Sequence, residues 1–187
     1  MVFSLISRLV EGIKRGVVSG LKGVADVGSS IVGVVRNVTV TTLKGTGEFV
    51  VKGIEVPASI VKGTITGIAE VGESVVKAVR GIVQGTIQGI MESGGEEKTA
   101  IKGSVAQAIY SAKELGLNLG EVAVEAIKGA VDGIKQVGGD TAEATKIAVL
   151  TALQTARDIG SEAVISVKEA IEAGVEGAKD IVKSIKE

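Results

Sequence analysis

Residues 60–72 read IVKGTITGIAEVG, and residues 82–94, which lie 22 positions further along, read IVQGTIQGIMESG. Stepping by 22 in both directions gives related segments, without insertion or deletion, that begin at residues 16, 38, 104, 126, 148 and 170. Each unit divides into two similar halves of equal length, because VGSSIVGVVRN (27–37) resembles VGESVVKAVRG (71–81). The chain of 187 residues is therefore predicted to be a repeat protein.

The 11-residue period predicts α-helices. Eleven residues make three helical turns at about 3.67 residues per turn, so each position of the repeat returns to the same side of a helix. Counted from Leu5, positions 1, 2, 5, 6 and 9 are mostly apolar and position 8 is mostly small. These positions are contiguous around the helix and form an apolar face over about half of its circumference. Representative residues of this face are Leu5, Ile6, Leu9, Ile13, Ile60, Val61, Ile65, Ile68, Ile82, Val83, Ile87 and Ile90.

Glycines recur at every fourth residue in two stretches of the chain, 12–20 and 81–89. Small residues at that spacing let two helix backbones approach closely. A glycine inside a helix costs about 1 kcal/mol relative to alanine, so a chain with 27 glycines needs compensating contacts. The glycines predicted to lie at close helix contacts are Gly12, Gly16, Gly20, Gly23, Gly67, Gly81, Gly85, Gly89, Gly133 and Gly177.

A row of basic residues borders the apolar face at position 10. On a lipid surface such residues would extend toward the headgroups while their aliphatic stems stay in the apolar layer. Alternatively, they form ion pairs within one helix, such as Lys135 with Asp132 or Lys168 with Glu172. This basic edge consists of Lys14, Arg36, Arg80, Lys102, Lys113, Lys135, Lys146, Arg157, Lys168 and Lys179.

Only one 11-residue row loses the apolar pattern thoroughly, and it lies in the middle of the chain at 93–103. Ser93, Gly94 and Gly95, followed by charged residues, indicate a turn. We therefore expect an all-α fold of two long amphipathic helices, packed as an antiparallel hairpin that oligomerises. Oligomerisation is expected because a single partner helix cannot cover so wide an apolar face.

This interpretation divides the chain into a basic Gly/Val-rich arm (1–92), a turn (93–97) and an acidic arm rich in Ala, Glu and Lys (98–187). Weaker breaks are expected at Pro57, which lacks a backbone donor, and at the Gly-Gly-Asp sequence of 138–140. The alternative for 31–66 is β-structure, because this stretch is rich in valine and threonine.

The composition argues against an enzyme. The chain has no histidine and no cysteine, which removes the commonest catalytic bases, thiolate nucleophiles and zinc ligands, and we predict no catalytic residue, metal or cofactor. A net charge of −1 gives no reason to expect a nucleic acid partner. The longest uncharged stretch, Gly81 to Met91, is shorter than the roughly 18 residues of a membrane-spanning helix. We therefore expect a cytoplasmic protein that is at most peripheral to a membrane.

Two segments, VGESVVKAVRGIVQGTIQGI (71–90) and IVKGTITGIAEVG (60–72), resemble the lipid-binding repeats of the synucleins. They are also similar to the 11-residue regions of perilipins, the 22-residue repeats of exchangeable apolipoproteins and the 11-residue (hendecad) coiled coils. The resemblance is one of period and composition and extends over nearly the whole chain. It implies helices that lie flat on lipid or, for the coiled coils, helices that pack on one another.

Two functions follow as expectations. The first is a non-enzymatic structural protein whose helices self-assemble laterally into a homo-oligomeric bundle, tube or filament. The second is a peripheral protein that binds a lipid or membrane surface. Abundant glycine favours the first, while the wide apolar face and the weak helix propensity of the first half favour the second.

Overall fold

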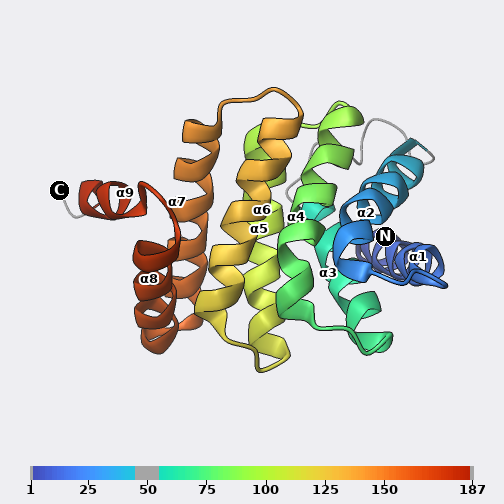
Figure 1. Cartoon of the computed structure of the whole chain (residues 1–187), viewed down its shortest axis with the longest axis horizontal. Coiled ribbons are helices and arrows are strands. Elements are labelled where there is room, and N and C mark those ends of the chain that lie inside the picture. The colour runs from blue at the N-terminus through green and yellow to red at the C-terminus, as the bar shows by residue number, and fades with distance from the viewer. Residues whose placement is uncertain (1, 45–54, 186–187) are drawn as a thin grey trace.

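The computed structural model describes residues 2–44 and 55–185, with side chains from Ile6 onward, and in this part the chain forms nine helices and no strands (Figure 1). The helices are α1 (Val2–Leu21), α2 (Val27–Lys44), α3 (Glu55–Glu70), α4 (Val75–Glu92), α5 (Glu97–Glu114), α6 (Leu119–Gln136), α7 (Thr141–Ile159), α8 (Ser161–Gly174) and α9 (Ala178–Ser184).

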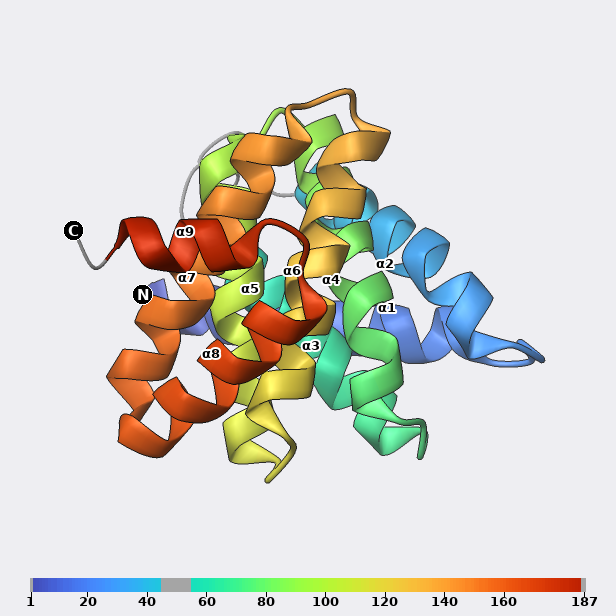
Figure 2. The ribbon, with the colours of Figure 1, turned by 60° about the vertical axis from the view of Figure 1, so that its left-hand side comes forward.

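The helices are arranged in two layers. The most extensive contacts join each helix to the next but one, as between α1 and α3, α2 and α4, and α4 and α6, and smaller contacts join helices that follow one another along the chain. One layer therefore holds the odd-numbered helices and the other holds the even-numbered helices. From α3 to α8 the turns alternate between the two edges of the array, so next-but-one helices run parallel (Figures 1 and 2). The pair α1 and α2 forms one end of the array, and α8 and α9 lie at the other.

One repeat corresponds to one helix and one turn. The helices α4, α5 and α6 are 18 residues long and are separated by four-residue turns, which accounts for the period of 22. Gly94 and Gly116, at equivalent positions of successive repeats, adopt left-handed φ angles of 86° and 69° at these turns. The amide of the residue after each glycine donates back into the preceding helix, Gly95 to the Ile90 carbonyl at 2.9 Å and Leu117 to the Ala112 carbonyl at 2.8 Å. Glycine ends the helices because it adopts this conformation without steric cost.

Side-chain caps start the following helices. The Asn118 side-chain oxygen accepts a hydrogen bond from the Glu121 amide at 3.0 Å, and the Asp140 carboxylate accepts one from the Ala142 amide at 2.9 Å. Such caps satisfy amide groups that have no partner inside the helix. Together with Gly116 and Gly138 in the same turns, they fix the end of one helix and the start of the next.

The predicted hairpin of two long helices is wrong. A turn does lie at 93–96, but equivalent turns lie at 71–74, 115–118 and 137–140. The error has a simple physical reason: 22 is twice 11, so separate helices that repeat with the longer period produce the same pattern as one continuous helix. Helices from both sides of the central turn also pack together, α3 against α5 and α4 against α6.

Two further expectations concern residues near the middle of the first half. Pro57 does not break a helix, because it lies in the first turn of α3, where its missing amide hydrogen is not needed. Residues 31–44 and 55–66, for which strands were the alternative, are helical. The rest of that stretch, 45–54, lies outside the described residues.

The apolar face is buried within the chain itself. An interior helix such as α6 contacts α4, α5, α7 and α8, so helices of the same chain cover a face of about half its circumference. The face residues Ile13, Ile60, Val61, Ile65, Ile68, Ile82, Val83, Ile87 and Ile90 are all buried. Ile6 and Leu9 are half-buried, and the side chain of Leu5 lies outside the described residues.

Candidate functional site

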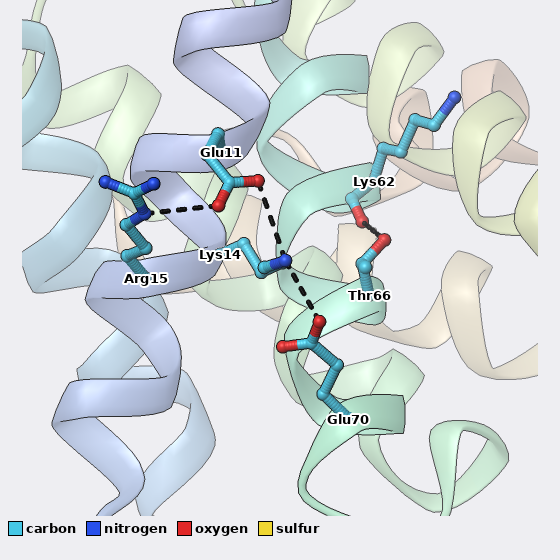
Figure 3. A network of polar contacts seen from close by, with 6 residues as sticks. All are labelled: Glu11, Lys14, Arg15, Lys62, Thr66 and Glu70. Carbon is cyan, nitrogen blue, oxygen red and sulfur yellow. Dashed lines mark hydrogen bonds and ion pairs between the residues drawn. The ribbon is translucent and has the colours of Figure 1, made fainter.

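In the described residues, ion pairs cross three of the seams between next-but-one helices. On α1 the Lys14 ammonium group donates to the Glu70 carboxylate of α3 at 2.9 Å and lies 3.5 Å from the Glu11 carboxylate, which also accepts a hydrogen bond from Arg15 at 3.1 Å (Figure 3). Beside this network on α3, the Thr66 hydroxyl donates to the Lys62 carbonyl at 2.8 Å. The hydrogen bond to Glu70 raises the pKa of Lys14 above its usual value.

The same arrangement recurs in the even layer. Arg36 of α2 donates to Glu92 of α4 at 2.6 Å, and Arg80 of α4 donates to Asp132 of α6 at 2.7 Å. Each hydrogen bond raises the pKa of its guanidinium group further above its usual range. These pairs are partly exposed, so they add little stability, and their main effect is to fix the register of parallel neighbours. Three residues of the basic edge therefore join helices within the chain.

The seam between α5 and α7 differs from these. Here the hydrogen-bond donor is an uncharged group: the Tyr110 hydroxyl donates to the Asp158 carboxylate at 3.4 Å. Burial, and then the charge of Asp158, raises the pKa of Tyr110 above its usual value. Basic-edge residues stand on both sides of this seam, Lys102 on α5 and Lys146 on α7, and neither forms an ion pair with a described residue. Unlike the three seams above, this seam thus has cations on both of its helices that form no ion pair with a described residue.

A groove of about 610 Å³ runs along this seam. Its walls are α5 and α7, and Ile185 borders it from the C-terminal side of α9. Leu150, with 37% of its surface exposed, and Tyr110, with 36%, give it an apolar section. The cations along it are Lys98, Lys102, Lys146 and Arg157, and the carboxylates are Glu143 and Asp158. This groove is the candidate site with the most distinctive chemistry in the described part of the chain.

Most of the predicted packing glycines lie at helix contacts inside the chain. On α4, an added Cβ at Gly85 would lie 2.6 Å from the Val32 carbonyl oxygen of α2, and one at Gly89 would lie 2.6 Å from Thr39 Cβ. Gly16 and Gly20 face α2, Gly67 faces α1, Gly81 faces α2 and Gly133 faces α4. Gly63 and Gly129 make equally close contacts and were not among the predicted glycines, although each lies one helical turn before one that was.

Three glycines are corrections to that set. A Cβ at Gly12 would meet no atom within 4 Å, so this glycine does not lie at a helix contact. Gly23 and Gly177 have φ angles of 77° and 78°, and they serve turns rather than packing. They occupy the same position of the 11-residue repeat as the contact glycines Gly67, Gly89 and Gly133, so the repeat alone could not separate the two roles.

The remaining basic-edge residues lie at the surface. Lys113, Lys135 and Lys179 are exposed, and Lys168 is half-buried. The alternative that the edge forms ion pairs within helices is wrong for both named examples, since no such pair joins Lys135 to Asp132 or Lys168 to Glu172 in the described residues. Asp132 instead accepts the hydrogen bond from Arg80 on the neighbouring helix.

Sequence reasoning missed Tyr110. It falls at a polar position of the repeat and is not among the residues predicted above, but it lines the groove and bridges two helices. A signal was present in the sequence: Tyr110 is the chain's one tyrosine, and Lys102 and Lys146 occupy equivalent positions two repeats apart. Finding the groove from these facts would have required the knowledge that next-but-one helices are neighbours.

The described residues were also searched for a metal site and for a helix that could span a membrane. Within 2–44 and 55–185 there is no group of three or more His, Cys, Asp or Glu side chains that could hold a metal ion. The helices of these residues also include none with the length and hydropathy needed to cross a bilayer. The sequence matches no protein-family model, and comparisons with curated proteins and with solved structures find no match.

The raised pKa of Tyr110 predicts a dependence of stability on alkaline pH. The unfolded tyrosine ionises near pH 10 and the folded one at higher pH, so the stability that Tyr110 provides is present below about pH 10 and falls as pH rises through the folded pKa. We expect Tyr110→Phe to lose about 0.5 kcal/mol of unfolding free energy at pH 8 and to show a smaller deficit above pH 11. Urea titrations of both proteins measure this difference, and tyrosinate absorbance reports the pKa directly. A deficit that does not change with pH would contradict the prediction.

Proposed function

We propose that the chain is a non-enzymatic structural protein that self-associates through the two ends of its helix array. The observation that supports this most directly is the exposed face of α2. Asn37 and Thr41 of α2 occupy the positions of the repeat that Gly81 and Gly85 occupy on α4, two repeats later. On α4 these positions form the close contact with α2, whereas on α2 both are exposed, as is Gly33 one turn earlier.

The neighbouring buried residues also show that α2 and α4 present equivalent faces. Ile31, Val35 and Thr39 of α2 are buried, and so are the residues two repeats later on α4. The face of α2 that points away from α4 thus has the positions of a helix contact, and no helix of the described residues lies against it. In a repeat array, the terminal helices are the places where the interior packing can be continued by another molecule.

The charges of the even layer are complementary at its two ends. Helix α2 has two cations and no carboxylate, while α8 has one cation and three carboxylates. The intermediate helices change gradually, since α4 has two cations and one carboxylate and α6 has two cations and three carboxylates. The most exposed large apolar residue of the described chain, Ile165 at 58%, also lies on α8. These charges favour contact of the α8 end of one copy with the α2 end of the next.

Association of unlike ends is heterologous, so it produces rings or open filaments rather than closed two-fold dimers. This mode differs from the lateral packing of long helices expected from the sequence, because the apolar faces are already covered within each chain. The remaining driving force lies in the array ends and their charges, which predicts weaker assembly at high salt.

The test is sedimentation of the purified protein over a range of concentrations, combined with electron microscopy in the absence of lipid. We expect large species that dissociate at high salt. Asn37→Glu places a carboxylate on the α2 face and should shift association to concentrations about tenfold higher or more. Gln136→Glu is the matched control, because it makes the same change in charge at an exposed residue of α6, and it should have little effect.

The alternative function makes a different prediction in the same experiment. A lipid-surface protein should sediment as a single small species and gain helicity by circular dichroism only on anionic vesicles. A monomer at all concentrations would overturn the self-association proposal. Equal loss of assembly in the Asn37→Glu and Gln136→Glu proteins would show that the α2 face is not the interface.

A further inference from the structure

We propose that the groove between α5 and α7 binds an acidic amphipathic helix of a partner protein. The proposal concerns a different surface from the array ends and is independent of self-association. Its first support is charge. Four cations line the groove and none of them forms an ion pair with a described residue, whereas Lys14, Arg36 and Arg80 at three other seams are paired with carboxylates.

The groove's own carboxylates do not neutralise these cations. Asp158 accepts hydrogen bonds from two neutral donors, the Tyr110 hydroxyl at 3.4 Å and the Gln154 amide at 3.0 Å. Glu143 is exposed and has no ion-pair partner among the described residues. The groove therefore has an excess of positive charge, which a ligand with carboxylate groups would compensate.

The placement of the cations indicates the shape of the ligand. Tyr110 bonds Asp158, which lies 48 residues further along, so on these parallel helices Lys98 stands opposite Lys146 and Lys102 stands opposite Leu150. Arg157 lies one 11-residue row beyond Lys146, which corresponds to three helical turns, or about 16 Å. A ligand that reaches both points needs anionic groups at about that separation.

Apolar side chains lie between these charged points. Leu150 is one turn beyond Lys146 on α7, and Ala106 is one turn beyond Lys102 on α5. Along α7 the groove therefore presents a cation at Lys146, an apolar side chain at Leu150 and a second cation at Arg157. An α-helix with carboxylates three helical turns apart and apolar residues between them on the same face matches this order, and helices commonly bind in grooves between other helices.

Other anionic ligands fit less well. A fatty acid has one anionic group and cannot contact both cationic points. A nucleic acid has closely and evenly spaced phosphates, which would meet Glu143 and Asp158 as well as the cations. Both are used as competitors in the test.

The probe is a synthetic alanine-based helical peptide with glutamate at positions i and i+11 and leucine at i+4 and i+7. Tyr110 is the chain's one tyrosine and there is no tryptophan, so the intrinsic fluorescence of the protein reports on the groove directly. We expect saturable binding that changes this fluorescence and weakens with added salt. The peptide with both glutamates replaced by glutamine should bind about tenfold more weakly.

The decisive variant is Lys146→Glu, which replaces a cation of the groove by a carboxylate opposite Lys98. It should weaken binding of the glutamate peptide about tenfold or more. Lys135→Glu makes the same change at an exposed residue of α6 outside the groove and should bind as the original protein does. Both lysines are exposed, so circular dichroism should show the same helicity for all three proteins.

Three results would overturn the proposal. The first is the absence of saturable binding by the glutamate peptide. The second is equal weakening by Lys146→Glu and Lys135→Glu, which would indicate a general charge effect. The third is displacement of the peptide by duplex DNA, polyphosphate or a fatty acid at comparable concentrations of ligand, which would show that the groove does not select a helix.

Discussion

Replacing Gly85 with alanine is expected to destabilise the protein by about 2–3 kcal/mol, although alanine is the better helix former. The new Cβ would lie 2.6 Å from the Val32 carbonyl oxygen, 3.0 Å from Val35 Cβ and 3.2 Å from the Arg36 amide nitrogen. Two of these three atoms belong to the backbone of α2 and cannot move by a side-chain rotation. The contact between α2 and α4 must therefore open, and this contact is among the most extensive in the array.

Gly33→Ala is the matched control for this prediction. Gly33 lies inside α2, its φ is helical, and an added Cβ would meet no atom within 4 Å. The same substitution should therefore stabilise the protein by about 0.5–1 kcal/mol, which is the difference in helix propensity between the two residues. Urea titrations followed by circular dichroism at low protein concentration compare the three proteins. If Gly85→Ala also stabilised the protein, the close contact of α2 with α4 would be disproved.

The all-α class and the 22-residue repeat could be predicted from the sequence because helical periodicity depends only on which residues are apolar. The small residues of the repeat also indicated where helices approach closely. Gly85 and Gly89 were predicted to lie at close helix contacts, and the structure places both against α2. What the pattern could not indicate was whether the partner helix belongs to the same chain or to another one.

The turns were missed for a physical reason. Gly72, Gly94, Gly116 and Gly138 recur once in each repeat with left-handed φ angles, and each occupies a position of the repeat that is otherwise apolar. When residues are compared only by their position in the repeat, a glycine inside a helix at an apolar position cannot be told from a glycine that ends a helix. The distinguishing signal is the capping residue two positions later, such as Asn118 after Gly116. Only this combination of signals marks a helix end.

The groove could not be predicted, because its residues come from helices whose adjacency follows from those turns. In a long hairpin, Lys102 and Lys146 would lie about 66 Å apart on one helix, at about 1.5 Å per residue. Folding each repeat back on the last brings them to the two sides of one seam. The ion pair between Arg80 and Asp132 was missed for the same reason, because the two residues lie on helices whose adjacency the sequence pattern does not show.

Replacing Ile127 with alanine is expected to cost about 2–5 kcal/mol, because it removes three carbon atoms from a closely packed site and leaves a cavity. Ile127 is fully buried on α6, the helix that contacts α4 and α8 in its own layer and α5 and α7 in the other. A cavity there weakens the contacts of α6 with all four neighbours. In an array whose stability is a sum of helix and neighbour interactions, the loss should therefore spread beyond α6.

The control is Ile165→Ala, at an isoleucine of α8 that is 58% exposed, which should change the free energy of unfolding by less than about 0.5 kcal/mol. Urea titrations measure both values, and hydrogen exchange shows which helices lose protection. Similar small losses for the two variants would mean that α6 does not lie at the centre of the core, and loss of protection confined to α6 would mean that the neighbouring helices are stable without it.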